Sequence, residues 1–528
     1  MKKGIYLLGL GVLLLLCMDL QAKVRLPHFF SSNMVLQRDM PIRVWGKADK
    51  NEVISVALNG SVQTAKTGKD GIWRVELPAM KAGGPYDMQI ESAEETIGLT
   101  NILIGDVWVC SGQSNMEFGL NNVINAGQEI AASTLPDIRL LNVPKNMQSK
   151  EQFDLEPCEW TACNPQTSPL FTAVGYFFGK ELQPEIGVPV GLIHTSWGGT
   201  DIETWTSWET AVKTNDTYKK YAGKDQEKAM GYSMDNIRLY KEALKKDKGL
   251  VQKWYVPAYK TKGWKTMAVP KVWEAELANE DGIVWFRKTI DLPAGVTGKK
   301  ARINLGAVDD EDLTYVNGVK VGEMNFWMPN RSYEIPAGVL KGGNNVIAVR
   351  ITDTGGLGGI LGKAEEVYLE IDGQRYSLAG DWVYKPSVVT SMYKVSGISP
   401  NSFSSLLYNG MVHPLIGYGI KGVIWYQGEN NAGRAYQYRT LFPAMINDWR
   451  QQWGYEFPFY IVQLSSWLKP VNDPNDWKKG WQFCRAAQLA CVTEIPNTGI
   501  AVTYDIGDEE DIHPKNKYDV GERLALWA

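Results

Sequence analysis

The stretch "VWVCSGQSNMEFG", residues 107–119, indicates which kind of fold this chain adopts. Its first four residues, Val107 to Cys110, are typical of a buried strand. The small and polar residues that follow, 111–115, favour a sharp turn. In α/β sheets, ligands bind at the loops that follow the carboxyl ends of the strands. The sequence therefore predicts that Ser114 lies exposed at the end of a buried strand.

Strands and helices alternate around this stretch. Residues 174–186, "VGYFFGKELQPEI", are amphipathic at helical spacing, and residues 188–200, "VPVGLIHTSWGGT", are typical of a buried strand ending in a glycine turn. The alternation returns at residues 420–433, "IKGVIWYQGENNAG", and continues with a helix, a strand and a helix. Repeated βα units predict an α/β fold with a mostly parallel sheet covered by helices.

Two other regions contain short strands separated by turns. Residues 24–100 hold strands at a spacing of about ten residues and a hairpin signal at Asn59-Gly60, which predicts a small β-sandwich. Residues 250–385 show alternating strands with tight-turn signals, and because exposed loops tolerate insertions we predict an inserted all-β domain there. The predicted domains are the N-terminal β-sandwich (23–100), the α/β domain in two parts (101–249 and 386–528) and the inserted β domain (250–385).

The two ends of the chain and its charge bear on where it acts. Residues 1–22 place Lys2 and Lys3 before an apolar run that is too short for a membrane span, which predicts a signal peptide and a chain exported to the periplasm or outside the cell. The net charge of −4 offers no basic field for nucleic acid or anionic lipid.

The last residues, "DVGERLALWA", begin a helix and stop within two turns, so the chain either ends there or is truncated.

The cysteines are expected to be structural. Two close pairs, Cys158/Cys163 and Cys484/Cys491, are the natural disulfide candidates in an exported chain. Neither pair has neighbouring histidines at zinc-ligand spacing, so no metal is predicted.

Ser114 is the first candidate for a nucleophile. At a turn after a strand its hydroxyl is exposed, and its backbone N–H points toward a developing oxyanion. The alternative is that Ser114 only caps the helix that follows. The spacing from Gly112 to Met116 differs from the G-x-S-x-G elbow of α/β-hydrolases, so a catalytic Ser114 belongs to another design.

A serine nucleophile requires a base, and the chain holds only four histidines: His28, His194, His413 and His513. His194 lies in an apolar strand, where a hydrogen-bonded core histidine is expected. His513 follows the acidic run 508–511, and a carboxylate two or three residues before a histidine can accept its Nδ1–H and orient Nε2 toward a serine. The alternative for this run is a solvated acidic loop.

Two further turns suit an oxyanion site. Gly198 and Gly199 follow one predicted strand and can offer an N–H without steric hindrance. The polar residues that follow another strand are Gln427, Glu429, Asn430 and Asn431. Each residue alone is also an ordinary turn former. Because all these turns follow strands of one α/β domain, we expect them to lie close together.

Four segments together resemble a known family: "GDVWVCSGQSNMEF" (105–118), "GLIHTSWGGTDIETW" (191–205), "GVIWYQGENNAG" (422–433) and "DIGDEEDIHPKNKYDVGERLA" (505–525). They are similar to the carbohydrate esterases of the SGNH (GDSL-like) hydrolase superfamily, specifically the sialate O-acetylesterases. This resemblance implies an SGNH-hydrolase-type three-layer parallel sheet. The inserted domain resembles the jelly-roll, galactose-binding-like modules of glycosidases.

The resemblance also implies residue roles. Ser114 would be the nucleophile, His513 the general base and then acid, and Asp511 the carboxylate that orients it. Many family members place the aspartate three residues before the histidine, where this chain has Glu510, and Asp508 is a further alternative. The oxyanion hole would use the amides of Ser114 and Gly198 with a side chain, either Gln427 as first choice or Asn430.

The implied reaction removes O-acetyl groups from sugars through an acetyl-enzyme, without metal or cofactor. The expected partner is an O-acetylated sugar, foremost a sialic acid, with Arg434 as a candidate cation for its carboxylate. One alternative is an acetylesterase acting on plant polysaccharide such as xylan. Another is a non-catalytic carbohydrate-binding protein, which would have no need of Ser114, His513 and Asp511 together.

Overall fold

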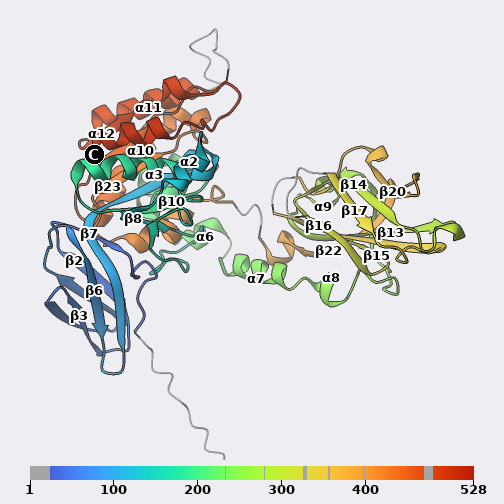
Figure 1. Cartoon of the computed structure of the whole chain (residues 1–528), viewed down its shortest axis with the longest axis horizontal. Helices are drawn as coiled ribbons and strands as arrows, with labels where there is room; N and C mark the ends of the chain where they lie inside the picture. Colours follow the sequence, from blue (N-terminus) through green and yellow to red (C-terminus); the bar gives the residue numbers. More distant parts are fainter. Residues whose placement is uncertain are drawn as a thin grey trace, which may run out of the picture. The chain divides into compact units, whose positions relative to one another are not determined.

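The structure is a computed structural model, and it describes residues 24–231, 234–278, 280–324, 330–354, 357–395, 399–468 and 480–528. The predicted signal peptide, residues 1–22, lies outside the described residues. The chain forms two compact units, one of residues 1–219 and 405–528 and the other of residues 220–404 (Figure 1). Each unit has its own sheets. None of the helices in the described ranges is both long enough and apolar enough to cross a membrane.

The first unit contains the predicted parallel sheet. Its strand order is β25-β24-β23-β7-β10-β8-β9, in which β9 alone runs antiparallel to its neighbour. Apolar side chains that are buried on both faces, as in Val423 to Tyr426, produce these strands. The bounds are β7 (Thr96–Gly112), β8 (Leu135–Asn142), β9 (Thr161–Cys163), β10 (Val190–Ser196), β23 (Gly422–Tyr426), β24 (Phe459–Val462) and β25 (Thr498–Ala501).

Helices cover this sheet, which makes the unit a mixed α/β structure as predicted (Figure 1). Helix α12 (Tyr518–Trp527) packs on α3 (Ala173–Ile186), and α10 (Ala435–Trp453) packs on α11 (Trp481–Glu494). The first pair is close, because a Cβ atom on Gly521 would lie 2.5 Å from Cβ of Phe177. Shorter helices of this unit are α1 (Ser114–Glu117), α2 (Ala126–Ala131), α4 (Trp208–Thr214) and α5 (Asp216–Lys219).

Strand β7 connects the N-terminal strands to the parallel sheet. Its first half pairs antiparallel with β6, from Thr96 opposite Glu91, and its second half pairs parallel with β10 from Asp106 onward. The predicted boundary at residue 100 therefore falls inside a single continuous strand. The N-terminal strands are β1 (Val35–Gln37), β2 (Ile42–Lys47), β3 (Val53–Leu58), β4 (Ser61–Lys66), β5 (Ile72–Leu77) and β6 (Gly83–Glu91). The hairpin predicted at Asn59-Gly60 joins β3 to β4, with both residues at positive φ.

The second unit is dominated by antiparallel strands. Within its described residues, one six-stranded sheet has the order β11-β22-β13-β18-β15-β16, and the other runs β12-β19-β14-β20-β21 with β17 paired to β14. The bounds are β11 (Lys265–Val269), β12 (Lys271–Val272), β13 (Gly282–Leu292), β14 (Ala301–Asp309), β15 (Glu311–Val316), β16 (Val319–Met324), β17 (Asn330–Ile335), β18 (Gly343–Asp353), β19 (Gly359–Leu361), β20 (Val367–Ile371), β21 (Gln374–Ser377) and β22 (Gly380–Val389). Its helices are α6 (Gln226–Met230), α7 (Met234–Lys245), α8 (Lys248–Val251) and α9 (Glu274–Leu277).

This unit has a core of its own, in which Trp273, Phe286 and Val349 are fully buried or nearly so. The turn signals predicted in it are confirmed. Asn317-Gly318 joins β15 to β16, and Asp372-Gly373 joins β20 to β21, each with both residues at positive φ.

The predicted disulfides are wrong, because the five cysteines among the described residues carry free thiols. Cys484 and Cys491 both lie on helix α11, so seven residues of helical rise separate them by about 10 Å, beyond the reach of a disulfide. Cys158 and Cys163 are likewise unbonded. Spacing along the chain suggested these pairs, but helix α11 separates the thiols of Cys484 and Cys491.

Candidate active site

Ser114 stands where strand β7 ends against strand β23. Gly112, the last residue of β7, has φ of +139°, and a Cβ atom there would lie 2.1 Å from the carbonyl oxygen of Tyr426. Only glycine lets the two strands meet this closely. The chain then turns, Gln113 is the N-cap residue of α1, and Ser114 is its first helical residue.

The Ser114 hydroxyl contacts His513 across 399 residues of sequence. Its Oγ lies 2.9 Å from Nε2 of His513, which follows strand β25. The ring of Phe118 stacks on the imidazole with 6.4 Å between centroids. Burial and the nearby Lys517 ammonium lower the pKa of His513, and Asp511 opposes them. The imidazole is therefore neutral at pH 7, and Nε2 can accept the serine proton.

Asp511 lies near His513 in the same loop. Its Oδ1 accepts the backbone N–H of His513 at 2.8 Å and lies 3.6 Å from the His513 Nδ1 atom. The second distance is too long for a hydrogen bond, so Asp511 acts on the imidazole mainly through its charge. Asp508, in contrast, accepts the backbone N–H of Glu510. The loop thus orients the Asp511 carboxylate to the side of the ring opposite Ser114.

Gly198 lies against Ser114, because a Cβ atom on Gly198 would come within 3.2 Å of the Ser114 Cβ. Its N–H donates to Oε2 of Glu117 at 2.6 Å, and the other oxygen of that carboxylate is 2.6 Å from the Lys145 ammonium. The N–H that was predicted to bind an oxyanion therefore holds a carboxylate in this structure. The N–H of Ser114, at the start of α1, has no acceptor within its helix.

The two side chains proposed for the oxyanion hole differ in how many of their amide hydrogens are already donated to other groups. Gln427 is fully buried, and its Nε2 donates to the Thr200 carbonyl at 3.0 Å and to Asn431 at 2.6 Å, which uses both of its hydrogens. The Nδ2 of Asn430 donates one hydrogen to Asp201 at 2.6 Å, and its other hydrogen has no acceptor among the described residues. Asn430 is therefore better suited to contact a substrate.

Arg434 is held by two carboxylates. Its guanidinium lies 2.9 Å from Asp201 and also pairs with Glu203. These carboxylates raise the pKa of Arg434 against the effect of burial. A substrate carboxylate would thus meet one cation and two anions.

The other histidines lie apart from Ser114. His194 is buried between Asn142 and Ser196, at 2.8 and 2.6 Å, and burial lowers its pKa to about 3, as expected of a core histidine. His28 pairs with Asp154, and His413 contacts Glu151 and the Gln152 carbonyl. Within the described ranges, no three His, Cys, Asp or Glu side chains gather as a metal site would require.

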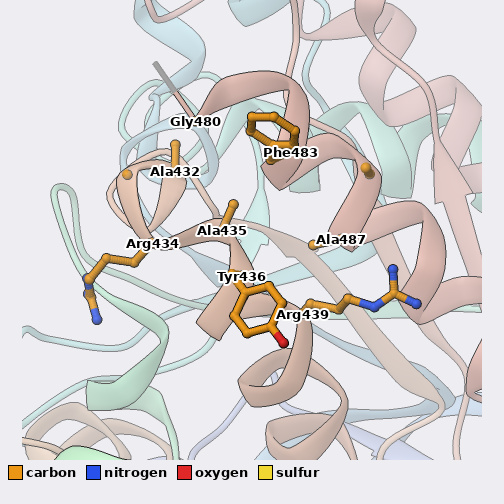
Figure 2. A pocket seen from close by; sticks show the side chains of 10 residues that line it. Ala432, Arg434, Ala435, Tyr436, Arg439, Gly480, Phe483 and Ala487 are labelled. Carbon is orange, nitrogen blue, oxygen red and sulfur yellow. The ribbon is translucent and has the colours of Figure 1, made fainter. Parts of the chain in front are cut away.

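A cavity of about 580 Å³ opens beside Arg434, between the start of α10 and the start of α11. Figure 2 shows Phe483 and Tyr436 on two sides of it, small alanine side chains between them, and the guanidinium of Arg434 pointing away. Tyr436 is 91% exposed. Aromatic faces with this access suit the apolar faces of sugar rings.

Sequence reasoning missed Asn115, Glu117 and Lys517 as parts of the site. All three lie within the segments that carried the family resemblance. Lys517 is fully buried, whereas Lys515, two residues earlier, is exposed. No pattern in the sequence separates these two lysines.

A serine hydroxyl bonded to a neutral imidazole, at the carboxyl edge of a parallel sheet covered by helices, defines a serine hydrolase. Comparison with known families narrows this class. Residues 104–240 and 397–527 match the family described as carbohydrate esterase, sialic acid-specific acetylesterase, and residues 251–356 match the second all-β domain of β-galactosidases. The chain belongs to this carbohydrate esterase family and is a carboxylic ester hydrolase.

Individual relatives agree with the family. The chain is 25% identical to the sialate O-acetylesterase of Rattus norvegicus, over 96% of this chain and 72% of the relative, and 24% identical to that of Homo sapiens, over 99% and 74%. A solved carbohydrate acetylesterase from Xanthomonas citri is 26% identical, with a TM-score of 0.58 over 96% of this chain and 74% of its own. The predicted resemblance to the sialate O-acetylesterases is confirmed.

Proposed function

We propose that the protein hydrolyses O-acetyl esters of sugars, with acetylated sialic acids as the substrate class, and that Ser114, His513 and Asp511 perform the reaction. The observation that carries the proposal is the 2.9 Å contact between Ser114 Oγ and His513 Nε2. Membership of the acetylesterase family supports the acetyl ester, and the names of the relatives support sialate.

The reaction proceeds in two halves. Ser114 Oγ attacks the acetyl carbonyl while His513 Nε2 takes the hydroxyl proton, and the imidazolium then gives that proton to the departing sugar oxygen. Water, deprotonated by His513, attacks the acetyl-enzyme and releases acetate. Asp511 stabilises the imidazolium, because its carboxylate lies 3.6 Å from Nδ1.

The oxyanion of each tetrahedral intermediate is stabilised by the Ser114 N–H and by the Asn430 side chain, which has one amide hydrogen without an acceptor in the described part of the chain. The Gly198 N–H contributes once the Glu117 carboxylate has moved away from it. Gln427 acts less directly, since its hydrogen bonds hold Asn431 and the Thr200 carbonyl in place.

Substrate selection involves the cluster around Arg434. Arg434 is the candidate that binds a sialate carboxylate, although its guanidinium already pairs with Asp201 and Glu203. This pairing favours the second candidate, a neutral acetylated polysaccharide such as xylan. The cavity between Tyr436 and Phe483 suits a sugar ring of either substrate.

The finer assignments of fold and location belong to the same proposal. We assign the α/β parts (101–249 and 386–528) to the SGNH-type three-layer fold, residues 23–100 to a β-sandwich and residues 250–385 to a jelly-roll module. The parallel order of β24-β23-β7-β10-β8 supports the first assignment, and the match of residues 251–356 to a β-galactosidase domain supports the last. We further propose export, on the composition of residues 1–22.

The test is hydrolysis of a chromogenic acetyl ester, a 9-O-acetylated sialoside and acetylated xylo-oligosaccharides by the purified chain. We expect Ser114→Ala and His513→Ala to lower kcat by at least about 10³-fold. Ser111→Ala is the matched control, because it removes a buried hydroxyl that has no hydrogen-bond partner among the described residues.

The outcomes of these assays distinguish the candidate functions. Faster turnover of the sialoside supports sialate, and faster turnover of the xylo-oligosaccharides transfers the proposal to neutral sugars. If the folded wild-type chain turns over no ester but binds the sugars in calorimetry, the catalytic proposal is wrong and the chain is a carbohydrate-binding protein.

A further inference from the structure

Behind the Ser114–His513 pair, Asn115 joins three separate segments of the chain. Its Nδ2 donates to Oε1 of Glu429 at 2.7 Å and to the carbonyl of Ile512 at 3.0 Å. Its Oδ1 accepts a hydrogen bond from the Lys517 ammonium. The amide of Asn115 thus connects the turn after β7, the turn after β23 and the loop that carries His513.

Lys517 is an unusual member of this network. Its side chain is fully buried, and its ammonium donates a hydrogen bond to Asn115 Oδ1. The ammonium lies 4.8 Å from the ring centre of Phe118 and 5.3 Å from that of Tyr426, where the ring faces attract a cation. A buried lysine opposes folding unless its charge is compensated, so a hydrophobic side chain of similar length would serve stability better.

The network acts on the catalytic histidine in two ways. Ile512 directly precedes His513, so the bond from Asn115 to the Ile512 carbonyl fixes the backbone from which the imidazole reaches Ser114. The Lys517 charge also disfavours protonation of His513.

The charged groups that face Lys517 are Glu429, from the turn after β23, and Asp511, from the loop after β25. Burial outweighs both carboxylates and lowers the pKa of Lys517 to about 7. The phenol of Tyr426, whose ring faces the ammonium, is itself buried and neutral at pH 7.

We propose that Lys517 is a positioning residue for ester hydrolysis: by holding the Asn115 amide, it keeps the Ile512 carbonyl in place and His513 Nε2 on Ser114 Oγ. The proposal rests on the proposed function of Ser114 and His513. Lys517 acts through Asn115 and the histidine loop, and its charge also acts on His513.

The test is Lys517→Met, with Lys515→Met as the matched control in the same loop. We expect Lys517→Met to lower kcat on the order of 10-fold to 100-fold with KM changed less than about two-fold, because positioning affects the chemical step. The acidic limb of the kcat/KM profile should move to higher pH, since the charge that repels the His513 proton is gone. The thermal midpoint should stay level or rise, because methionine removes a buried charge. Lys515→Met should change none of these quantities.

A further variant keeps the proposal testable if Lys517→Met fails to fold. Asn115→Asp retains the acceptor for Lys517 but loses both donated hydrogen bonds, and should lower kcat as Lys517→Met does.

A folded Lys517→Met variant with wild-type kcat and a wild-type pH profile would overturn the inference. So would an Asn115→Asp variant with wild-type kcat. An inactive wild-type chain, or an active Ser114→Ala variant, would instead overturn the proposed function. The two failures are therefore distinguishable.

Discussion

Two opposite charges act on the imidazole of His513, the Lys517 ammonium and the Asp511 carboxylate. Burial and Lys517 together lower the pKa of His513, so the proposed base is neutral over the whole range above that pKa. Because only the neutral imidazole accepts the Ser114 proton, kcat/KM should rise with pH through the pKa of His513, below the ordinary histidine value of about 6.5. Asp511→Asn removes the charge that favours the imidazolium, so we expect the acidic limb to move to still lower pH and kcat to fall roughly 10-fold to 100-fold. A pH series of kcat/KM measures both effects. Glu510→Gln is the control, and an equal shift in that variant would mean that Asp511 is not the orienting carboxylate.

At the scale of elements, strand β7 connects two regions of the first unit. It pairs with β6 in the N-terminal region and with β10 and β23 in the parallel sheet. At its last residue, Gly112, a Cβ atom would lie 2.1 Å from the Tyr426 carbonyl oxygen of β23. Gly112→Ala should therefore destabilise the first unit by more than about 2 kcal/mol and lower esterase activity, because Ser114 follows two residues later. Gly127→Ala is the control: Gly127 is exposed in helix α2 with open space around its Cβ position, and alanine should stabilise by about 0.5 to 1 kcal/mol. Urea unfolding of both variants checks the pair, and equal stabilities would contradict the close approach.

At the scale of the whole molecule, the two units have separate sheets, and the second has its own apolar core. Chains built in this way often unfold in more than one step, so we expect two calorimetric transitions. In the second unit, Arg331 and Asp312 form an ion pair at 2.9 Å with both side chains fully buried. Arg331→Met leaves the Asp312 carboxylate buried without this cation and should destabilise that unit by about 3 to 5 kcal/mol, which lowers one transition and leaves the other and kcat at 25 °C unchanged. Arg302→Met, which removes an exposed pair with Glu334 in the same unit, should have little effect. A common shift of both transitions in Arg331→Met would show that the units unfold together.

Much of the fold follows from local patterns in the sequence. The buried strand before Ser114, the βα alternation and the hairpins at Asn59-Gly60 and Asn317-Gly318 all appear in the structure. Apolar periodicity and turn chemistry act over a few residues, so they can be interpreted without knowing what the segment packs against. The continuity of β7 across the predicted boundary was not predictable in this way, because strand pairing depends on distant partners.

The sequence by itself determined the candidates of the site: a serine at the end of a strand, a histidine after an acidic run, and amides after two other strands. Only the tertiary structure decided which of them have free atoms to offer. It shows both hydrogens of the Gln427 amide donated, Arg434 paired with two carboxylates, and Lys517 buried where Lys515 is exposed. The physical reason is that burial and hydrogen-bond partners depend on contacts between segments far apart in the chain. The type of a residue and its spacing from its neighbours in sequence do not determine those contacts.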